Sequence, residues 1–527
     1  MTRLALRGAV VTMDDAATVR QDGVVWIGDD GRIVAVLAAS AAPPAGFETV
    51  TPIVTGGVIY PGLIDLHNHL PYNTIGLWRD ETRKAPYVDH DQWPRRKSYG
   101  ASISQPGNFL GWVTAPSLLA YVEMKAIVGG TTTIQGNGKV SRSVEGALAR
   151  NIDNEKFGAP HDQFRVTTIV PSRATDLVPI GQAMADHGIG FIYHLTEGVS
   201  PRMAAEWTKA VEGGIVRKGL VAIHGTGLGR TEVEKLARVE ATVVWSPFSN
   251  MWLYGGTLDV RAAKAAGVRL CLGSDWAPSG TKHVLGELKV ASLCSADPDA
   301  WRPVPATPQQ PHGDPLFSDL ELCRMVTSNP GDAIAAVAGP QVGRLQPGWL
   351  GDVVVVRKAV AEPYRNLVRA TEADVQLVVV GGEPRYGTKA LMSAMGATNT
   401  SAVAVDGLDD RVAVIRSPQN LTKFFTWADV VARLQAVRAD PPAAARELAL
   451  ALAAVGNDLS RPDAPLVVIG DMPFKGAAAQ IAGRNDPPQP CPVPPLQSLR
   501  HDAAWFDAVD AHSFHRGLLS PLRGFYA

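Results

Sequence analysis

Two histidines separated by one residue follow an apolar run early in the chain. Residues 58–66 are almost entirely apolar and lead into His67-Asn68-His69. Alternate side chains of an extended strand share a face, so His67 and His69 project to the same side. Two neutral imidazoles on one side suit a divalent transition metal. Such a pair is a weak indication by itself, and a metal site requires further ligands downstream.

Further candidate ligands stand at the ends of other short apolar segments. His194 ends residues 190–194, His224 ends residues 220–224, and Asp275 follows residues 268–274. Glu197 comes three residues after His194. Enzymes built on parallel barrels carry their chemistry at the carboxyl ends of the strands, so this pattern is expected of one site assembled from several strands. Each residue alone could be a hydrogen-bonded core histidine or a helix cap, but all of them at matching strand ends favour a common site.

Strands alternate with helical stretches over residues 61–343, which predicts an α/β fold with a (β/α)8 TIM barrel. Helices are expected near 118–128, 203–212, 232–237 and 260–266, and strands near 131–135 and 164–171. Residues 137–193 must hold two strands and two helices. The third and fourth units are therefore expected to be short and the barrel to be distorted there.

The segments that flank the barrel alternate as β-strands. Residues 4–13 and 23–36 precede it, with a turn signal at Asp29-Asp30-Gly31, and residues 351–357 and 375–380 follow it. We expect residues 1–60 and 344–395 to form one composite β-sandwich domain. Residues 396–527 are expected to be a C-terminal extension that packs against the barrel or a neighbouring subunit. It should be partly helical, at 426–439 and 443–455, and irregular at the proline-rich stretch 487–495.

The composition is that of an ordinary enzyme. The chain has 527 residues, a net charge of −1 and 46% hydrophobic residues. No bulk charge attracts nucleic acid or anionic membranes, and no apolar run approaches the roughly 18 to 20 residues of a membrane span. The N-terminus lacks the features of a secretory signal, and the four cysteines show no CxxC spacing. We expect a cytoplasmic protein with reduced cysteines, a small-molecule substrate, a homo-oligomeric state, and neither nucleic acid nor membrane as partner.

Taken together, the motifs resemble those of the amidohydrolase superfamily of metal-dependent hydrolases. The matching stretches cover residues 1 to about 390 and are Pro61 to His69, Gly129 to Thr133, His194 to Glu197, His224, Ser246 to Asn250, Gly273 to Asp275, Thr327 to Pro330, Gly343 to Gly348 and Gly351 to Val356. Binuclear relatives carry a carboxylated lysine on the fourth strand, and residues 164–172 contain no lysine. The resemblance therefore implies one metal ion, by default zinc, with iron as an alternative.

The expected chemistry uses water activated by that ion. The ligands are expected to be His67, His69, His194 and Asp275, and such an ion lowers the pKa of a bound water toward neutrality. Asp275 can accept the proton of the water, and the resemblance places Glu197 where it can carry a proton to the departing nitrogen. His224 either ligates the ion or hydrogen-bonds the substrate oxygen, and we favour the second role.

The substrate is expected to be set by the long segment after the first strand, from Leu70 to about Pro116. Aromatic and basic residues alternate there, which suits a flat or anionic small molecule, although the same residues could simply anchor the segment. Tyr72 and Trp78 are expected to form its wall. The sequence predicts a hydrolase that cleaves a C–N bond in an amide, a cyclic amide or an amino-substituted ring. The alternative is a catalytically inactive binding or assembly protein on the same barrel.

Overall fold

The computed structural model describes residues 3–141, 146–167, 170, 172–303, 314–469, 496 and 499–527. Its central element is a set of parallel strands in two groups, one of five strands and one of three. The first group is β9 (Phe164–Thr167), β10 (Gly190–Leu195), β11 (Leu220–His224), β12 (Thr242–Trp245) and β13 (Arg269–Leu272). The second is β5 (Leu63–Asp65), β6 (Thr131–Ile134) and β8 (Arg150–Asn151). The two groups supply the strands of the predicted barrel.

One side of the barrel closes through the residues after its first and last strands. Asn68 and Asp275 form an isolated parallel bridge that links the end of β5 to the end of β13. On the opposite side the third strand, β8, spans only two residues, and the described residues show no ladder between β8 and β9. The predicted distortion at the third and fourth units is therefore present. Its cause is the small number of residues available between β6 and β10.

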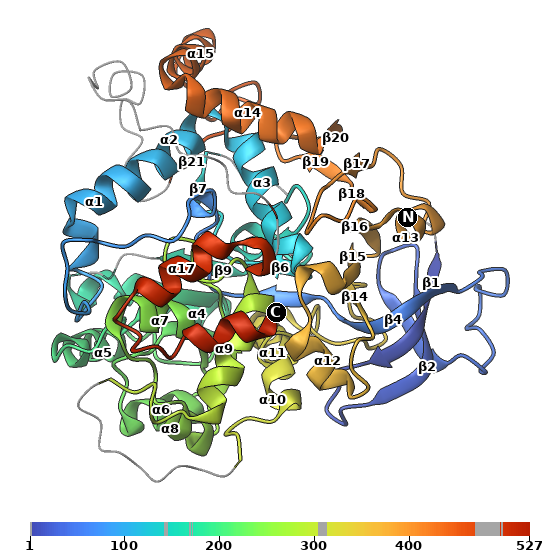
Figure 1. Ribbon diagram of the computed structural model, residues 1–527, viewed down its shortest axis with the longest axis horizontal. Coiled ribbons are helices and arrows are strands. Elements are labelled where there is room, and N and C mark those ends of the chain that lie inside the picture. Colours follow the sequence, from blue (N-terminus) through green and yellow to red (C-terminus); the bar gives the residue numbers. More distant parts are fainter. Residues whose placement is uncertain are drawn as a thin grey trace.

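Helices surround these strands (Figure 1). They are α3 (Ala115–Val128), α4 (Val178–His187), α5 (Arg202–Glu212), α6 (Arg230–Arg238), α8 (Val260–Ala266), α9 (Val284–Ala296), α10 (Asp319–Arg324) and α11 (Ser328–Ala338). Every residue of β10 and β11 is buried. Parallel strands covered on both faces read as continuous apolar runs, and this is why the ligand-bearing segments were recognisable in the sequence.

The segments on either side of the barrel join in one nine-stranded sheet. Its order is β17-β18-β16-β15-β14-β4-β1-β2-β3. The strands are β1 (Leu4–Val11), β2 (Val19–Ile27), β3 (Ile33–Ala38), β4 (Ile53–Pro61), β14 (Val353–Arg357), β15 (Val375–Val380), β16 (Glu383–Thr388), β17 (Ser401–Ala402) and β18 (Arg411–Ala413). The sheet thus continues past residue 395, where the composite domain was expected to end. The sequence did not reveal β17 and β18, because strands of two and three residues are too short to show an alternating pattern. The second layer of a β-sandwich remains a prediction.

The C-terminal extension packs against the barrel of the same chain. It contains β19 (Ile415–Ser417), β20 (Asn420–Phe425), α14 (Trp427–Ala439), α15 (Pro441–Ala454) and α17 (Ala503–Ala511). The ring of Trp427 stacks on Tyr121 of α3 at 5.4 Å. Trp505 of α17 lies 5.2 Å from Phe248, at the loop after the seventh barrel strand, and α17 crosses in front of α7 (Pro247–Tyr254) in Figure 1. The extension therefore covers loops at the carboxyl ends of the strands. Cys491 and residues 487–495 lie outside the described residues.

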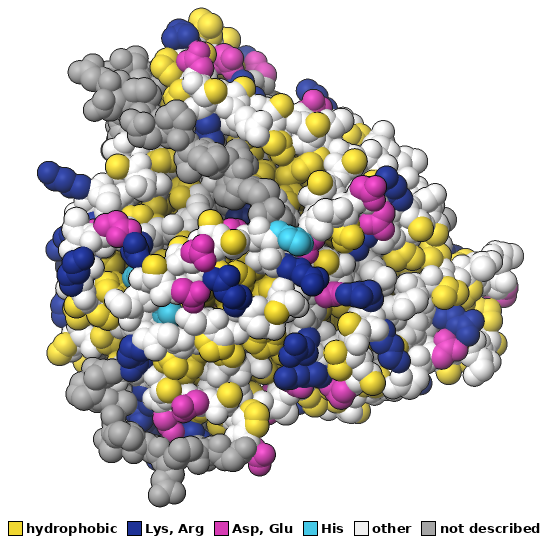
Figure 2. Space-filling model, viewed as in Figure 1, with side chains coloured by type: hydrophobic (Ala, Val, Ile, Leu, Met, Phe, Trp, Pro, Cys, Tyr) yellow, Lys and Arg dark blue, Asp and Glu magenta, His cyan; other side chains and the backbone are white. Residues whose placement is uncertain are grey.

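Charged side chains of both signs are intermixed on the face shown in Figure 2. This distribution agrees with the near-zero net charge of the sequence. Among the described residues, none of the helices is long and apolar enough to cross a membrane. Cys271, Cys294 and Cys323 are free thiols and buried.

Candidate metal centre

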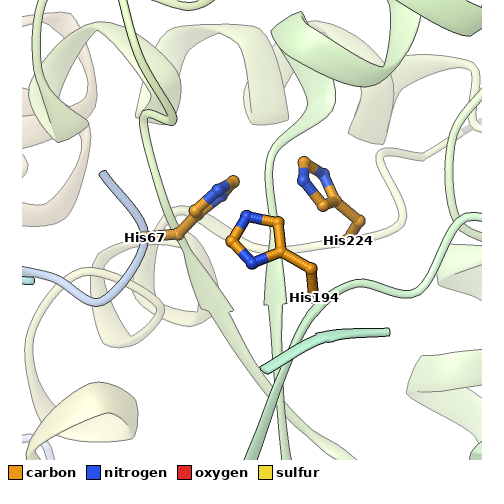
Figure 3. A group of neighbouring side chains, drawn as sticks. All are labelled: His67, His194 and His224. Atoms are coloured by element: carbon orange, nitrogen blue, oxygen red, sulfur yellow. The ribbon is translucent and has the colours of Figure 1, made fainter. Parts of the chain in front are cut away.

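The predicted ligands converge at the carboxyl ends of the barrel strands. His67 follows β5, His194 lies in β10, His224 ends β11 and Asp275 follows β13. The nitrogens of His67, His194 and His224 lie within 4.8 Å of one another, and the same holds for one ligand atom each of His67, His69 and Asp275. The rings of His67, His194 and His224 point toward one another (Figure 3). Residues far apart in the sequence thus form one cluster.

The carboxylate of Asp275 lies close to two of the predicted histidine ligands. Its Oδ1 lies 3.3 Å from Nε2 of His67 and 3.5 Å from Nε2 of His69. Nε2 of His69 lies 3.3 Å from Nε2 of His194. The backbone N–H of Asp275 donates to the carbonyl of His67 at 2.9 Å, so the first and eighth strands hold their ligands in register.

The cluster fits a metal ion. Nε2 of His67 is buried and has no hydrogen-bond partner, whereas its Nδ1 lies 2.7 Å from Oγ of Ser246. Buried polar atoms are rarely left unpaired in folded proteins, and a cation among these groups would satisfy the nitrogen. Imidazoles with one carboxylate are the donor set of zinc and other first-row metals, and a hydrogen bond at the far nitrogen is the usual support of a ligating histidine.

The electrostatic environment favours ligation. Burial lowers the pKa of His67 and of His194 well below the usual value, and the neighbouring imidazoles add to this effect. Neutral imidazole is the form that binds metals. Burial raises the pKa of Asp275 to about 7, with His224 acting against this rise and Glu197 adding to it. A divalent cation at this position would favour the ionised carboxylate.

His224 and Glu197 form the other half of the site. Nδ1 of His224 donates to Oδ1 of Asn250 at 2.9 Å, while the amide of Asn250 donates to Thr257 at 3.0 Å, which fixes its orientation. His224 therefore presents Nε2 to the cluster, and this atom lies 3.6 Å from Oε1 of Glu197. The hydroxyl of Tyr254 donates to the same carboxylate oxygen at 2.6 Å.

The backbone turns sharply where these side chains leave their strands. His224 and Asp275 have φ values of 67° and 56°, and Thr196, next to Glu197, has 53°. Non-glycine residues rarely adopt this left-handed conformation, and it is enriched at functional sites. Gly273 is required by packing, since a Cβ there would lie 2.5 Å from Cβ of His67.

Asp65 supports the centre without contacting a ligand ring. Its Oδ1 accepts from the backbone N–H of His67 at 3.2 Å and from that of Ser274 at 3.2 Å. Its Oδ2 accepts from the side chains of Asn68 and Ser274. The carboxylate therefore ties the end of the first strand to the end of the eighth.

The segment after the first strand supplies an aromatic cluster beside His69. The Trp276 ring lies 5.8 Å from His69, and Tyr72 lies 5.4 Å from Trp276. Trp78 lies farther out, stacked on Tyr87 at 6.4 Å. His69 is the most exposed of the predicted ligands, with 21% of its side chain accessible against 0% for His67 and 4% for Asp275, and His194 is buried. The aromatic cluster therefore borders the accessible side of the centre.

Sequence reasoning missed several residues that complete the site. The sequence assigned no role to Ser246, Tyr254 or Trp276, and Asn250 entered only as the end of a stretch that resembles the family. Ser246 and Asn250 stand in a polar stretch directly after the seventh strand, which is a signal of the kind that revealed the ligands. Tyr254 lies at the end of a buried helix, and nothing in its spacing marks it.

Comparisons with known proteins agree with this geometry. A model of the amidohydrolase family matches residues 182–385, a range that contains His194, His224 and Asp275. The 5-methylthioadenosine/S-adenosylhomocysteine deaminase of Thermococcus onnurineus (strain NA1) is 24% identical over 376 residues, which are 62% of this chain and 82% of that protein. The deaminase of the same description from Pyrococcus furiosus is 24% identical over 418 residues, 71% of this chain and 93% of that protein. The family model and these relatives support the assignment of the chain to the amidohydrolase superfamily.

Solved structures share the fold of this chain. A mutant of atrazine chlorohydrolase from Arthrobacter aurescens TC1, complexed with zinc and atraton, superimposes with a TM-score of 0.55 at 19% identity, covering 72% of this chain and 94% of that one. Guanine deaminase from C. acetobutylicum gives a TM-score of 0.55 at 16% identity, covering 72% of this chain and 99% of that one. Each superposition covers 72% of this chain, so the shared fold does not extend over all of its residues.

Proposed function

We propose that this chain is a metal-dependent hydrolase that uses an activated water to cleave a C–N bond in an amino-substituted ring of a small molecule. The observation that carries the proposal is the joint cluster of His67, His69, His194 and Asp275 with Glu197 and His224 beside it. Six groups with complementary chemistry meet at one point. An inactive binding protein would have no need to retain all of them, so the hydrolase reading is favoured.

His67, His69, His194 and Asp275 would hold one divalent ion, with zinc proposed. Zinc is present in the related atrazine chlorohydrolase structure. When bound, such an ion acidifies a water molecule so that it can attack at neutral pH. Ser246 orients His67 through the 2.7 Å contact with Nδ1, which leaves Nε2 directed at the ion.

Glu197 is proposed as the proton carrier. Its Oε1 lies 3.6 Å from Nε2 of His224 and receives the hydrogen bond of Tyr254. From this position the carboxylate can take a proton from the attacking water, assisted by Asp275, and deliver it to the departing nitrogen. His224 is proposed to hydrogen-bond the substrate atom on which negative charge develops, and Asn250 keeps its ring in place.

The proposed substrate class follows from the relatives and from the aromatic cluster. The similar proteins are described as deaminases of 5-methylthioadenosine or S-adenosylhomocysteine, a guanine deaminase and an atrazine chlorohydrolase. The compounds in these names share a flat, nitrogen-rich ring. Trp276 and Tyr72 border the accessible side of His69 and offer faces for such a ring. Trp78 is proposed to support this wall from behind, because it packs on Tyr99, which lies 6.0 Å from Trp276.

The test combines metal analysis with a substrate panel. Purified protein is assayed for bound metals, for ammonia release from amino-purines and amino-triazines, and for ring opening of two cyclic amides, hydantoin and dihydrouracil, which releases no ammonia. We expect one equivalent of zinc and ammonia release from an amino-substituted ring. Glu197→Gln should retain the metal and lose at least about 100-fold in turnover, whereas Glu240→Gln, at an exposed ion pair with Lys218, should match the wild type. Retained metal with no turnover of any ring or amide would contradict the proposal.

Three further features are proposed. They are a cytoplasmic location, a homo-oligomeric state, and a division into a composite β-sandwich domain (1–60 and 344–395), a catalytic barrel (61–343) and an extension (396–527). The pairing of β4 (Ile53–Pro61) with β14 (Val353–Arg357) in one sheet supports the composite domain. The stacking of Trp427 on Tyr121 supports an extension that accompanies the barrel.

A further inference from the structure

A cavity of about 560 Å³ lies away from the metal centre, where β8 of the barrel meets β15 and β16 of the sheet. None of the proposed metal ligands lines it. The residues around it are Gly146, Leu148, Ala149, Arg150, Asn151, Asn154, Glu155, Lys156, Val380 and Arg385. We call it the Asn151 cavity. It joins two parts of the molecule that the sequence keeps far apart, and most of its named residues are polar.

Three carboxylates of this region are engaged by arginines. Glu155 lies 3.1 Å from Nη1 of Arg150, and Asp352 lies 3.1 Å from Nη2 of the same residue. Glu383 lies 2.8 Å from the guanidinium of Arg385. A fourth carboxylate, that of the buried Glu123, accepts from the backbone N–H groups of Leu148 and Ala149 through Oε2, whereas its Oε1 has no partner.

Several N–H donors of the same wall have no partner. Nδ2 of Asn151, Nδ2 of Asn154, and Nε of Arg150 and of Arg385 are buried without a hydrogen bond. Asn151 is only 5% exposed, and its Oδ1 accepts from the backbone N–H of Asp153 at 3.1 Å, which leaves its NH₂ group as the unsatisfied end. Buried polar groups in folded proteins are almost always paired. Four unpaired donors of one kind therefore indicate a missing acceptor.

The charge of the wall has the matching sign. Arg150, Arg385 and Lys156 line the cavity together with a single acid, Glu155. Burial lowers the pKa of Arg385; Glu383 and Glu123 oppose this effect, and the nearby charges of Arg416 and Arg150 add to it. Because a guanidinium remains charged under all ordinary conditions, the residues that line the cavity carry more positive than negative charge, although Asp352, Glu383 and Glu123 lie close to them.

We propose that the Asn151 cavity is an anion-binding site for a small molecule that bears phosphate or carboxylate groups. Such groups only accept hydrogen bonds, so each of their oxygens can serve the unpaired donors. Water would fit less well, because each water also donates two hydrogen bonds, and among Glu155, Asp352, Glu383 and Glu123 only Glu123 has a buried oxygen without a partner. The proposal is independent of the catalytic function proposed above, since it uses none of the same residues.

The test is isothermal titration of the full-length, metal-replete protein with inorganic phosphate and, separately, with citrate, at constant ionic strength set with chloride. Asn151→Asp keeps the oxygen that accepts from Asp153 and replaces only the unpaired NH₂ with a charged acceptor. Asn457→Asp makes the same isosteric change at an exposed position and is the matched control. Unfolding midpoints without added anion report whether each variant is folded.

We expect saturable binding to the wild type and to Asn457→Asp, and at least tenfold weaker binding to Asn151→Asp. Binding of phosphate alone would identify a phosphate-bearing ligand, and binding of citrate alone a carboxylate-bearing one. Should Asn151→Asp fail to fold, Lys156→Gln at the exposed rim serves instead, with an expected loss of several-fold. The proposal is overturned if neither anion binds the wild type, or if every variant responds equally to the same anion.

Discussion

The phenol of Tyr254 and the carboxylate of Glu197 are joined by a 2.6 Å hydrogen bond, although Glu197 follows β10 and Tyr254 ends helix α7, which follows β12. Burial raises the pKa of Tyr254 well above its usual value, and the charge of Glu197 adds to this rise. Tyr254 is therefore the donor. Nε1 of Trp93 donates in turn to the Tyr254 oxygen at 2.9 Å. The proposed proton carrier is thus held by a two-step hydrogen-bonded chain.

Replacement of this phenol should slow the reaction without loss of metal. Tyr254→Phe removes one hydrogen bond to a charged group, a change of about 1.5–3 kcal/mol, which corresponds to about a 10- to 100-fold decrease in kcat. The metal content should stay at the wild-type level, because Tyr254 contacts none of the proposed ligands. Steady-state kinetics and metal analysis check both statements.

Tyr193→Phe is the matched control for this effect. Tyr193 directly precedes His194 in the sequence. Its hydroxyl is also buried, but it has no hydrogen-bond partner. Its removal should leave kcat within about twofold of the wild type, since no hydrogen bond is lost. Equal losses in the two variants would show that the Tyr254 contact has no role in positioning Glu197.

A methyl group at Gly273 should displace the first metal ligand. The Cβ of an alanine would lie 2.5 Å from Cβ of His67, closer than real Cβ contacts occur, so the strand ends must separate. We expect Gly273→Ala to lose most of its bound metal and its activity. Gly76→Ala, where a Cβ meets nothing within 4 Å, should behave as wild type. Full metal occupancy in Gly273→Ala, measured by elemental analysis, would contradict the proposed role of His67.

The clustering of the proposed ligands could be predicted because their signal in the sequence is local. His194 and His224 end apolar runs that are buried on both faces, and the spacing of His67 and His69 follows from the alternation of a strand. The barrel brings all strand ends to one edge, so order along the chain was enough to group them. The comparisons confirm the superfamily that these motifs indicated.

The residues that orient the ligands were not predictable in the same way. Tyr254 reaches Glu197 from the end of helix α7, and the backbone of His224 and Asp275 is left-handed. Neither property leaves a periodic pattern. The same reason explains why β17 and β18 were assigned to the extension: strands of two or three residues carry no alternation, and only their pairing with β16 reveals them.

Stability should decrease on the alkaline side through His90. Burial acts to lower the pKa of His90, but the 2.7 Å contact with Glu206 and the charges of Glu197, Glu206 and Asp91 outweigh it and raise the pKa to about 9. An unfolded histidine titrates near 6.5. Because the folded pKa is the higher one, this stabilisation is fully present below pH of about 6.5 and is lost as the pH rises through about 9, with an upper limit of about 3 kcal/mol.

Urea unfolding of the wild type and of Glu206→Gln across this range isolates the effect of the pair. Glu206→Gln should show a smaller decrease in the free energy of unfolding between pH 6.5 and 9, because His90 then loses its main partner. Glu212→Gln, an exposed position on the same helix α5, should follow the wild-type curve. Parallel curves for the wild type and Glu206→Gln would exclude the pair as the source of the pH dependence.

Removal of the metal should destabilise the fold as well as abolish activity. The cluster exists only in the folded chain, so an ion that binds there stabilises the native state by about 2.7 kcal/mol at a free concentration one hundred times its Kd. Chelator-treated protein should therefore unfold at a lower temperature, and added zinc should restore both the midpoint and turnover. Asp275→Asn, which removes the charge 3.3 Å from Nε2 of His67, should show a much smaller response to zinc. Because neutral imidazoles alone attract the cation less strongly than a site with a carboxylate, an Asp275→Asn variant that responds to zinc as the wild type does would remove Asp275 from the ligand set.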